Sequence, residues 1–135
     1  MSKIDLSIII VNYKCWDVLA RCIDSFNKYK PHTNYEIIIV DNDSQDGKFN
    51  SFQQQFHEIK LIANKGNYGF SSACNLGADN AKGDFLLFLN PDVTLTSSPA
   101  IDEMFNFAKA NTNVGITSCR TIYPNGKRER EVAFL

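Results

Sequence analysis

The chain has 135 residues and a formal net charge of −1, from 14 Lys and Arg against 15 Asp and Glu. This length suits a single domain, and a hydrophobic fraction of 44% excludes a disordered chain. The balanced charge argues against a nucleic-acid binder, which would carry a clear basic excess. No apolar run approaches the roughly 18 residues of a membrane span. The chain shows no signal peptide and no CxxC pair, so we expect a reduced, cytoplasmic protein.

Apolar runs and helical periodicities alternate along the chain, with Ser71 as a candidate helix N-cap and Gly83 as a candidate helix stop. Strands buried on both faces are predicted at residues 6–11, 36–40 and 85–89, and further strands at 59–62 and 114–118. Helices are predicted at residues 16–26, 49–56, 71–81 and from Pro99 onward. Pro124-Asn125-Gly126 predicts a hairpin turn between 120–123 and 127–132.

This order predicts an α/β fold with a mainly parallel sheet flanked by helices and followed by a C-terminal β-hairpin. In such sheets, ligands bind beyond the carboxyl ends of the strands. Polar clusters follow the predicted strands at Asn12-Tyr13, Asp41-Asn42-Asp43, Gly66–Gly69 and Asn90-Pro91-Asp92. Their concentration at one edge of the sheet predicts a binding site there.

The cluster after the fourth strand contains a carboxylate, Asp92, whose position the strand would fix. Such a carboxylate suits Mg²⁺ or Mn²⁺, which often bring phosphate oxygens with them. Asn90 can offer a neutral oxygen nearby. The alternative is a plain turn, because Asn-Pro-Asp is favourable turn chemistry by itself.

The clusters after the second and third strands also have two interpretations each. Asp41, Asn42 and Asp43 could bind a base or ribose, or they could belong to a helix start capped by Ser44 or Asp46. The Gly66–Gly69 loop could let the backbone approach a nucleotide closely, or it could be an ordinary turn before a helix.

Several enzyme classes lack their signatures in this chain. No GxGxxG follows the first strand and no GxxxxGK[ST] occurs, which argues against a dinucleotide oxidoreductase and a P-loop nucleotidase. No Ser/His/Asp set stands at hydrolase-like positions. We assign no role to His32 or His57, and the cysteines are interpreted as core residues.

Four segments in this order resemble the family 2 glycosyltransferases: Leu6–Tyr13, Ile39–Gly47, Asn64–Gly77 and Phe88–Asp92. The variant is similar to the rhamnosyltransferase-like branch, in which Asn-Pro-Asp stands in place of the usual Asp-x-Asp. The resemblance covers nearly the whole chain. Each segment is weak evidence alone, but the four together in this spacing are highly specific.

The resemblance implies a GT-A (Rossmann-like) fold that binds a dTDP- or UDP-sugar with a divalent cation, Mg²⁺ or Mn²⁺. It implies these nucleotide-sugar-binding residues: Val11, Asn12, Tyr13, Asp41, Asn42, Asn67, Gly69 and Asn90. The implied metal ligand is Asp92. Asn90 replaces the aspartate of the general pattern and removes one negative charge, so the metal would be held less tightly before the donor arrives.

The resemblance further implies that residues 1–135 are the donor-binding part of an inverting glycosyltransferase of polysaccharide biosynthesis. We expect the catalytic base, and the site for a saccharide or lipid-linked acceptor, beyond Leu135. The protein would work in the cytoplasm or at the inner face of the membrane. The apolar tail Val132–Leu135 predicts a homodimer through the C-terminal region. Two alternatives stay open: a non-catalytic nucleotide-sugar-binding fragment, and an α/β protein-interaction domain.

Overall fold

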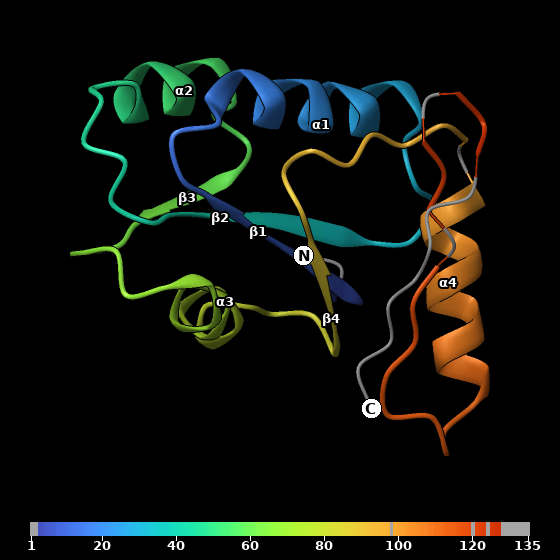
Figure 1. The fold of residues 1–135 in the computed structure, drawn as a ribbon. Helices are drawn as coiled ribbons and strands as arrows, with labels where there is room; N and C mark the ends of the chain where they lie inside the picture. The colour runs from blue at the N-terminus through green and yellow to red at the C-terminus, as the bar shows by residue number, and fades with distance from the viewer. Residues whose placement is uncertain (1–2, 98, 120, 124, 128–135) are drawn as a thin grey trace.

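A computed structural model describes residues 3–97, 99–119, 121–123 and 125–127. Strands and helices alternate along this part of the chain, as predicted (Figure 1). The elements are β1 (Leu6–Asn12), α1 (Trp16–Lys28), β2 (Tyr35–Asp41), α2 (Phe49–Gln55), β3 (Lys60–Ala63), α3 (Phe70–Asp79), β4 (Phe85–Leu89) and α4 (Pro99–Ala110).

The four strands form one parallel sheet in the order β3-β2-β1-β4. β1 is central and every one of its residues is buried, which explains its unbroken apolar run. Helices α1 and α2 cover one face of the sheet, α3 covers the other, and α4 stands to one side (Figure 1). The predicted α/β class with a parallel sheet between helices is confirmed.

Alternating residues of the strands supply the two cores. On the α1 side, Ile8 and Ile10 pack with Leu19 and Phe26 in the larger cluster. On the α3 side, the smaller cluster consists of Val11, Val40, Ala73 and Cys74. Period-two alternation of β-strand side chains therefore lets one apolar run serve both faces.

The prediction that residues 85–89 are buried on both faces is wrong. Leu86 is 44% exposed and Phe88 is 49% exposed, whereas the strand's other apolar residues join the α1-side core. Helix α3 packs on β1 and β2, so it does not cover the face of β4 on which Leu86 and Phe88 lie. An apolar run indicates a strand, but it does not reveal which neighbour covers each face.

Three local predictions also fail. Residues 114–118 form no strand in the described part of the chain. Helix α3 begins directly after Gly69, whose φ of 88° and N-cap position replace the predicted cap at Ser71. Gly83 does not end this helix, which stops at Asp79. Gly83 is needed for close packing, since a Cβ there would lie 2.6 Å from the Ser7 backbone nitrogen.

The predicted hairpin turn is partly described. Two hydrogen bonds close it: Tyr123 N–H to the Lys127 carbonyl and Gly126 N–H to the Tyr123 carbonyl, each 2.8 Å. The predicted hairpin strands fall partly, and the tail Val132–Leu135 falls wholly, outside the described residues. Among the residues described, none of the helices has the length and apolarity to cross a membrane.

Candidate functional site

The ends of β1 and β2 meet at the carboxyl edge of the sheet. Asn12 and Asp41 occupy the same register position, and both side chains are buried. The Asn12 amide Nδ2 donates a 2.7 Å hydrogen bond to Asp41 Oδ1. Parallel pairing therefore brings together two predicted site residues that are 29 positions apart in the chain.

A third buried side chain, Ser44, completes this arrangement. Its hydroxyl donates to Asp41 Oδ1 at 2.5 Å, and its backbone N–H donates to Asp41 Oδ2 at 3.2 Å. The same hydroxyl accepts the backbone N–H of Lys14 at 2.9 Å. We call Asn12, Asp41 and Ser44 the Asp41 network, and it ties the loop after β1 to the loop after β2.

The capping role predicted for Ser44 or Asp46 is wrong. Helix α2 has Lys48 at its N-cap position, with no side-chain capping bond. The Asp46 carboxylate accepts the Trp16 indole N–H, at 2.8 Å to Oδ2, and the Lys48 backbone N–H before the helix, at 3.2 Å to Oδ1. Ser44 and Asp46 each bond a near residue and a residue 30 positions away, and local capping patterns do not reveal the distant partner.

Asn42 connects the network to the Gly/Asn-rich loop between β3 and α3. Its Nδ2 donates to Asn67 Oδ1 at 2.9 Å, and its Oδ1 accepts from Asn64 Nδ2 at 3.0 Å. Asn67 Oδ1 also accepts the Gly69 backbone N–H at 3.2 Å. Asn64 is an additional member of this edge. The structure thus joins five of the expected residues there: Asn12, Asp41, Asn42, Asn67 and Gly69.

The loops beyond β1 and β2 hold unusual backbone conformations. Lys14, Asp43 and Gln45 have φ values of 57°, 65° and 49°, a left-handed region that non-glycine residues seldom adopt. Such residues concentrate at functional sites, where surrounding bonds hold them in place. Here Lys14 is held through its bond to Ser44.

Exposed aromatic rings surround these loops. Tyr13, Tyr68 and Phe70 are exposed, and the Lys14 ammonium lies 5.2 Å from the centroid of the Tyr13 ring. Exposed rings offer flat faces on which nucleic-acid bases stack. Val11 is buried, so only its backbone is placed to meet a ligand.

Asn90 and Asp92 follow β4, the strand that pairs with β1 on the other side from β2. Both side chains are exposed, and no hydrogen bond within the described residues joins them to the Asp41 network. The Asn90 carbonyl accepts the Val93 N–H at 3.2 Å, so the segment is a turn as well as a candidate site. Burial, and after it the charge of Asp92, raises the pKa of the Cys22 thiol on α1 to about 12.

The residues at this edge suit a cation that arrives with a ligand. Within the described part of the chain, no group of three His, Cys, Asp or Glu side chains could hold a metal ion. Mg²⁺ commonly binds one or two carboxylates and completes its shell with phosphate oxygens and waters. A single exposed carboxylate at Asp92 fits that pattern and does not form a metal cage.

Comparison with known proteins now identifies the family. The sequence profile described as "Glycosyl transferase family 2" matches residues 7–133. The chain belongs to glycosyl transferase family 2. It is 32% identical over 111 residues to the poly(ribitol-phosphate) beta-glucosyltransferase of Bacillus spizizenii, covering 78% of this chain and 17% of that protein. It is 29% identical over 128 residues to the minor teichoic acid biosynthesis protein GgaB of Bacillus subtilis, covering 91% of this chain and 14% of that protein.

Solved structures share the fold of this family 2 chain. S. aureus TarS 1-349 in complex with UDP has a TM-score of 0.67 at 20% identity, covering 80% of this chain and 33% of that chain. The mannosyltransferase PcManGT from Pyrobaculum calidifontis, in complex with GDP-Man and Mn²⁺, has a TM-score of 0.68 at 15% identity, with the same coverages of 80% and 33%. The GT-A fold implied by the sequence is confirmed. The chain spans about a third of these structures and less than a fifth of the two relatives above.

Proposed function

We propose that this chain is the donor-binding part of an inverting glycosyltransferase and that it holds a nucleotide-diphosphate sugar at the carboxyl edge of the sheet. The observation that carries this proposal is the bonded set at that edge, which links β1, β2 and the Gly/Asn-rich loop in a member of family 2. A buried framework of this kind fixes the loops before a ligand binds, and that lowers the entropic cost of binding.

The nucleoside would lie against the ends of β1 and β2. The Asp41 carboxylate has about four acceptor positions and receives three internal hydrogen bonds. The remaining position suits the ring N–H of uracil or thymine. Tyr13 and Tyr68 offer exposed rings for stacking.

The diphosphate would lie toward the end of β4, with a divalent cation held by Asp92 and assisted by Asn90. Such an ion neutralises the negative charge that develops on a leaving diphosphate. In an inverting transfer, an acceptor hydroxyl attacks the anomeric carbon, the bond to the diphosphate oxygen breaks, and a base takes the hydroxyl proton. We propose that this base and the acceptor site belong to a further part of a longer polypeptide.

The finer assignments follow from the same segments. A UDP- or dTDP-sugar is the proposed donor, and the Asn-Pro-Asp variant supports a rhamnosyltransferase-like specificity. The acceptor is proposed to be a saccharide or lipid-linked saccharide. The names of two relatives, which refer to poly(ribitol-phosphate) and teichoic acid, agree with a role in cell-surface polymer synthesis.

Thermal unfolding of the full chain with UDP, dTDP and GDP, each with and without Mn²⁺, tests the proposal. A ligand that binds only the folded state raises the melting temperature. We expect UDP or dTDP to raise it, more so with Mn²⁺. A GDP effect that exceeds both would contradict the assigned base. No effect from any nucleotide would favour the protein-interaction alternative.

A further inference from the structure

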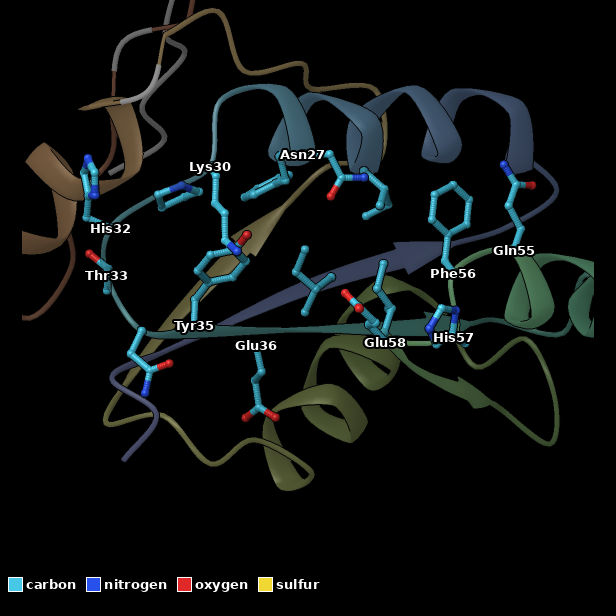
Figure 2. A pocket seen from close by; sticks show the side chains of 16 residues that line it. Asn27, Lys30, His32, Thr33, Tyr35, Glu36, Gln55, Phe56, His57 and Glu58 are labelled. Carbon is cyan, nitrogen blue, oxygen red and sulfur yellow. The ribbon is translucent and has the colours of Figure 1, made fainter. Parts of the chain in front are cut away.

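A pocket of about 560 Å³ opens on the α1 face of the sheet, at the amino-terminal half of β2. It lies between the end of α1, the start of β2 and the segment that follows α2 (Figure 2). We call it the Tyr35 pocket and define it by Phe26, Asn27, Lys30, Tyr35, Phe56 and Glu58. Its volume falls within the roughly 300–1,000 Å³ typical of small-molecule sites.

The pocket exists because α2 is short. Helix α1 has 13 residues and α2 has seven, which correspond to about 20 Å and about 10 Å at 1.5 Å per residue. Helix α2 ends at Gln55 and leaves the amino-terminal half of the neighbouring strands open. Tyr35 and Ile37 of β2 are accordingly only half-buried, whereas Ile39 is fully buried.

The floor of the pocket is apolar and partly aromatic. The rings of Phe26 and Tyr35 lie 6.0 Å apart between centroids, tilted by 42°. Phe56 stands at the other end of the pocket (Figure 2). Its ring centroid lies 4.7 Å from that of Phe52. Phe26 is fully buried, so the half-buried rings of Tyr35 and Phe56 are the apolar surfaces against which a ligand can pack.

The rim is polar, and four of its side chains are available to a ligand. Asn27, Lys30, His57 and Glu58 are exposed, and none makes a hydrogen bond or ion pair with another described residue. Glu36 differs, because its carboxylate accepts from the Ser7 hydroxyl at 2.7 Å and from the Lys82 N–H at 2.6 Å, on the opposite face of the sheet. A ligand that binds the four exposed groups would therefore break no internal bond.

The charges of the rim select the class of ligand. Lys30 and Glu58 carry opposite charges, so these two groups leave the rim without a net charge. An anionic ligand would meet the Glu58 carboxylate, and a cationic one would meet Lys30. Burial, and after it the charge of Glu58, raises the pKa of Tyr35, which keeps that hydroxyl protonated as a donor.

We propose that the Tyr35 pocket binds a neutral sugar ring of a saccharide, separately from the nucleotide site. A sugar ring has an apolar face that matches the aromatic floor, and hydroxyl groups that match Asn27, Glu58 and the Tyr35 hydroxyl. The pocket is at the amino-terminal half of β2, and the nucleotide edge is at its carboxyl end, so both sites can be filled together. A saccharide held here stays at high local concentration near the enzyme.

The test is a set of ¹H–¹⁵N NMR titrations of the full chain with methyl β-D-glucopyranoside, and separately with ribitol 5-phosphate. We expect the glucoside to shift the amide signals of Asn27, Tyr35 and Glu58, equally with and without saturating UDP. Ribitol 5-phosphate, which is anionic, should bind more weakly. Tighter binding of the phosphate would overturn the ligand class. Absence of shifts up to the solubility limit, or shifts confined to the loops after β1 and β2, would overturn the site.

Two variants make the test specific. Asn27→Ala and Glu58→Gln each change an exposed group without internal partners among the described residues, so folding should be retained. Asn27→Ala should weaken glucoside binding by about fivefold, as expected for the loss of one hydrogen bond. Glu58→Gln keeps an acceptor oxygen but loses the charge that strengthens the bond, so it should weaken binding by a smaller factor. Gln54→Ala and Glu103→Gln are matched controls outside the pocket and should bind like the parent. Equal affinity in all four variants would contradict the proposal, whatever the outcome at the nucleotide site.

Discussion

The side chains of Asn12 and Asp41 lie opposite each other at the ends of β1 and β2, and a 2.7 Å hydrogen bond joins them. Both are buried, so water does not compete for this bond. The Asn12 carbonyl also accepts the Asn42 backbone N–H at 2.8 Å. The edge that we propose for the nucleotide is thus built by the protein's own bonds, and its polar groups are aligned in advance.

Replacing Asp41 should affect stability and binding together. In Asp41→Asn, an NH₂ group replaces one of the two carboxylate oxygens. Oδ1 accepts from the Asn12 amide and the Ser44 hydroxyl, and Oδ2 accepts from the Ser44 N–H, so at least one buried donor loses its acceptor. Unpaired buried donors cost about 1–3 kcal/mol each, so we expect the free energy of unfolding in urea to fall by roughly 3 kcal/mol. Where the variant remains folded, it should bind UDP and UDP-sugar more weakly by a similar factor.

Asp43→Asn is the matched control for this change. Asp43 is half-buried, its carboxylate accepts only from the neighbouring Gln45 side chain within the described residues, and Asn tolerates the same positive φ. Its stability should stay within about 0.5 kcal/mol of the parent. Equal stabilities of the two variants would show that the Asp41 network does not hold the edge together, and a binding loss limited to the sugar-bearing ligand would contradict the nucleoside role.

Gly77 sets the distance between α3 and the sheet. A Cβ at this position would lie 2.5 Å from Ile9 Cγ2 and 3.4 Å from Val40 Cγ2. Gly77→Ala gains about 1 kcal/mol of helix propensity, but overpacking of a core costs about 1–3 kcal/mol. We expect net destabilisation in thermal unfolding. Ser72→Ala, on the exposed side of the same helix, should be neutral or slightly stabilising; a Gly77→Ala protein as stable as that control would show that α3 can shift freely.

Asp102 ties α4 to the turn before β2. Its carboxylate accepts the His32 N–H at 3.0 Å, the Thr33 N–H at 2.8 Å and the Thr33 hydroxyl at 2.6 Å. Burial alone would raise the pKa of Asp102, but the bonds from His32 and Thr33 outweigh burial and lower the pKa below 3.8. Asp102→Asn should therefore lower the free energy of unfolding at pH 7, by about 1 kcal/mol at this partly solvated site.

The stability difference between the parent and Asp102→Asn should depend on pH in a defined direction. A carboxyl group whose pKa is lowered in the folded state stabilises the protein above its unfolded pKa, and this stabilisation is lost as the pH falls through the folded pKa. The difference between parent and Asp102→Asn in urea unfolding should be constant at neutral pH and shrink below pH 3.8. Glu103→Gln, in the same helical turn, removes an exposed carboxylate that has no hydrogen-bond partner among the described residues and is the matched control. A difference independent of pH would mean that the charge of Asp102 plays no part.

The cysteines should differ in reactivity. Burial, and after it the charge of Asp92, raises the pKa of Cys22 from 9.0 to about 12, which reduces its thiolate fraction at pH 8 by about a thousandfold. Cys119 is exposed. Iodoacetamide followed by peptide mass spectrometry should modify Cys119 first and Cys22 only when the chain unfolds. Comparable rates in the native protein would contradict the buried position of Cys22, and urea should equalise them.

Much of the fold follows from local sequence signals. The strand Phe85–Leu89 was predicted with the bounds it has, because polar and turn residues stand at both ends of a short apolar run. Its exposed face was not predicted, since coverage by α3 depends on packing between distant elements. Helix α3 begins after Gly69, which occupies the N-cap position, whereas the sequence favours Ser71 because serine is a common N-cap residue.

The ends of the predicted strands indicate where the candidate site lies, but they do not reveal which side chains bond one another there. Asn12 and Asp41 were expected at one edge because parallel strands end together. The sequence offers Ser44 or Asp46 as a helix cap in one of two interpretations, whereas in the structure the Ser44 hydroxyl bonds Asp41 and Lys14. The Tyr35 pocket had no sequence signal at all, because it results from the shortness of α2 and from residues whose pattern is typical of an ordinary core.

The most direct test of the central claim is NMR of the full chain with UDP and Mg²⁺, followed by traces of Mn²⁺, whose unpaired electrons broaden nearby signals. UDP should shift the amides of Tyr13 and Asn42, and Mn²⁺ should broaden Asn90 and Asp92 only when UDP is present. Asp92→Asn should lose this broadening, and Asp79→Asn, an exposed aspartate of α3, should keep it. UDP without effect on these loops, or broadening centred elsewhere in the chain, would contradict a nucleotide and metal site at the carboxyl edge.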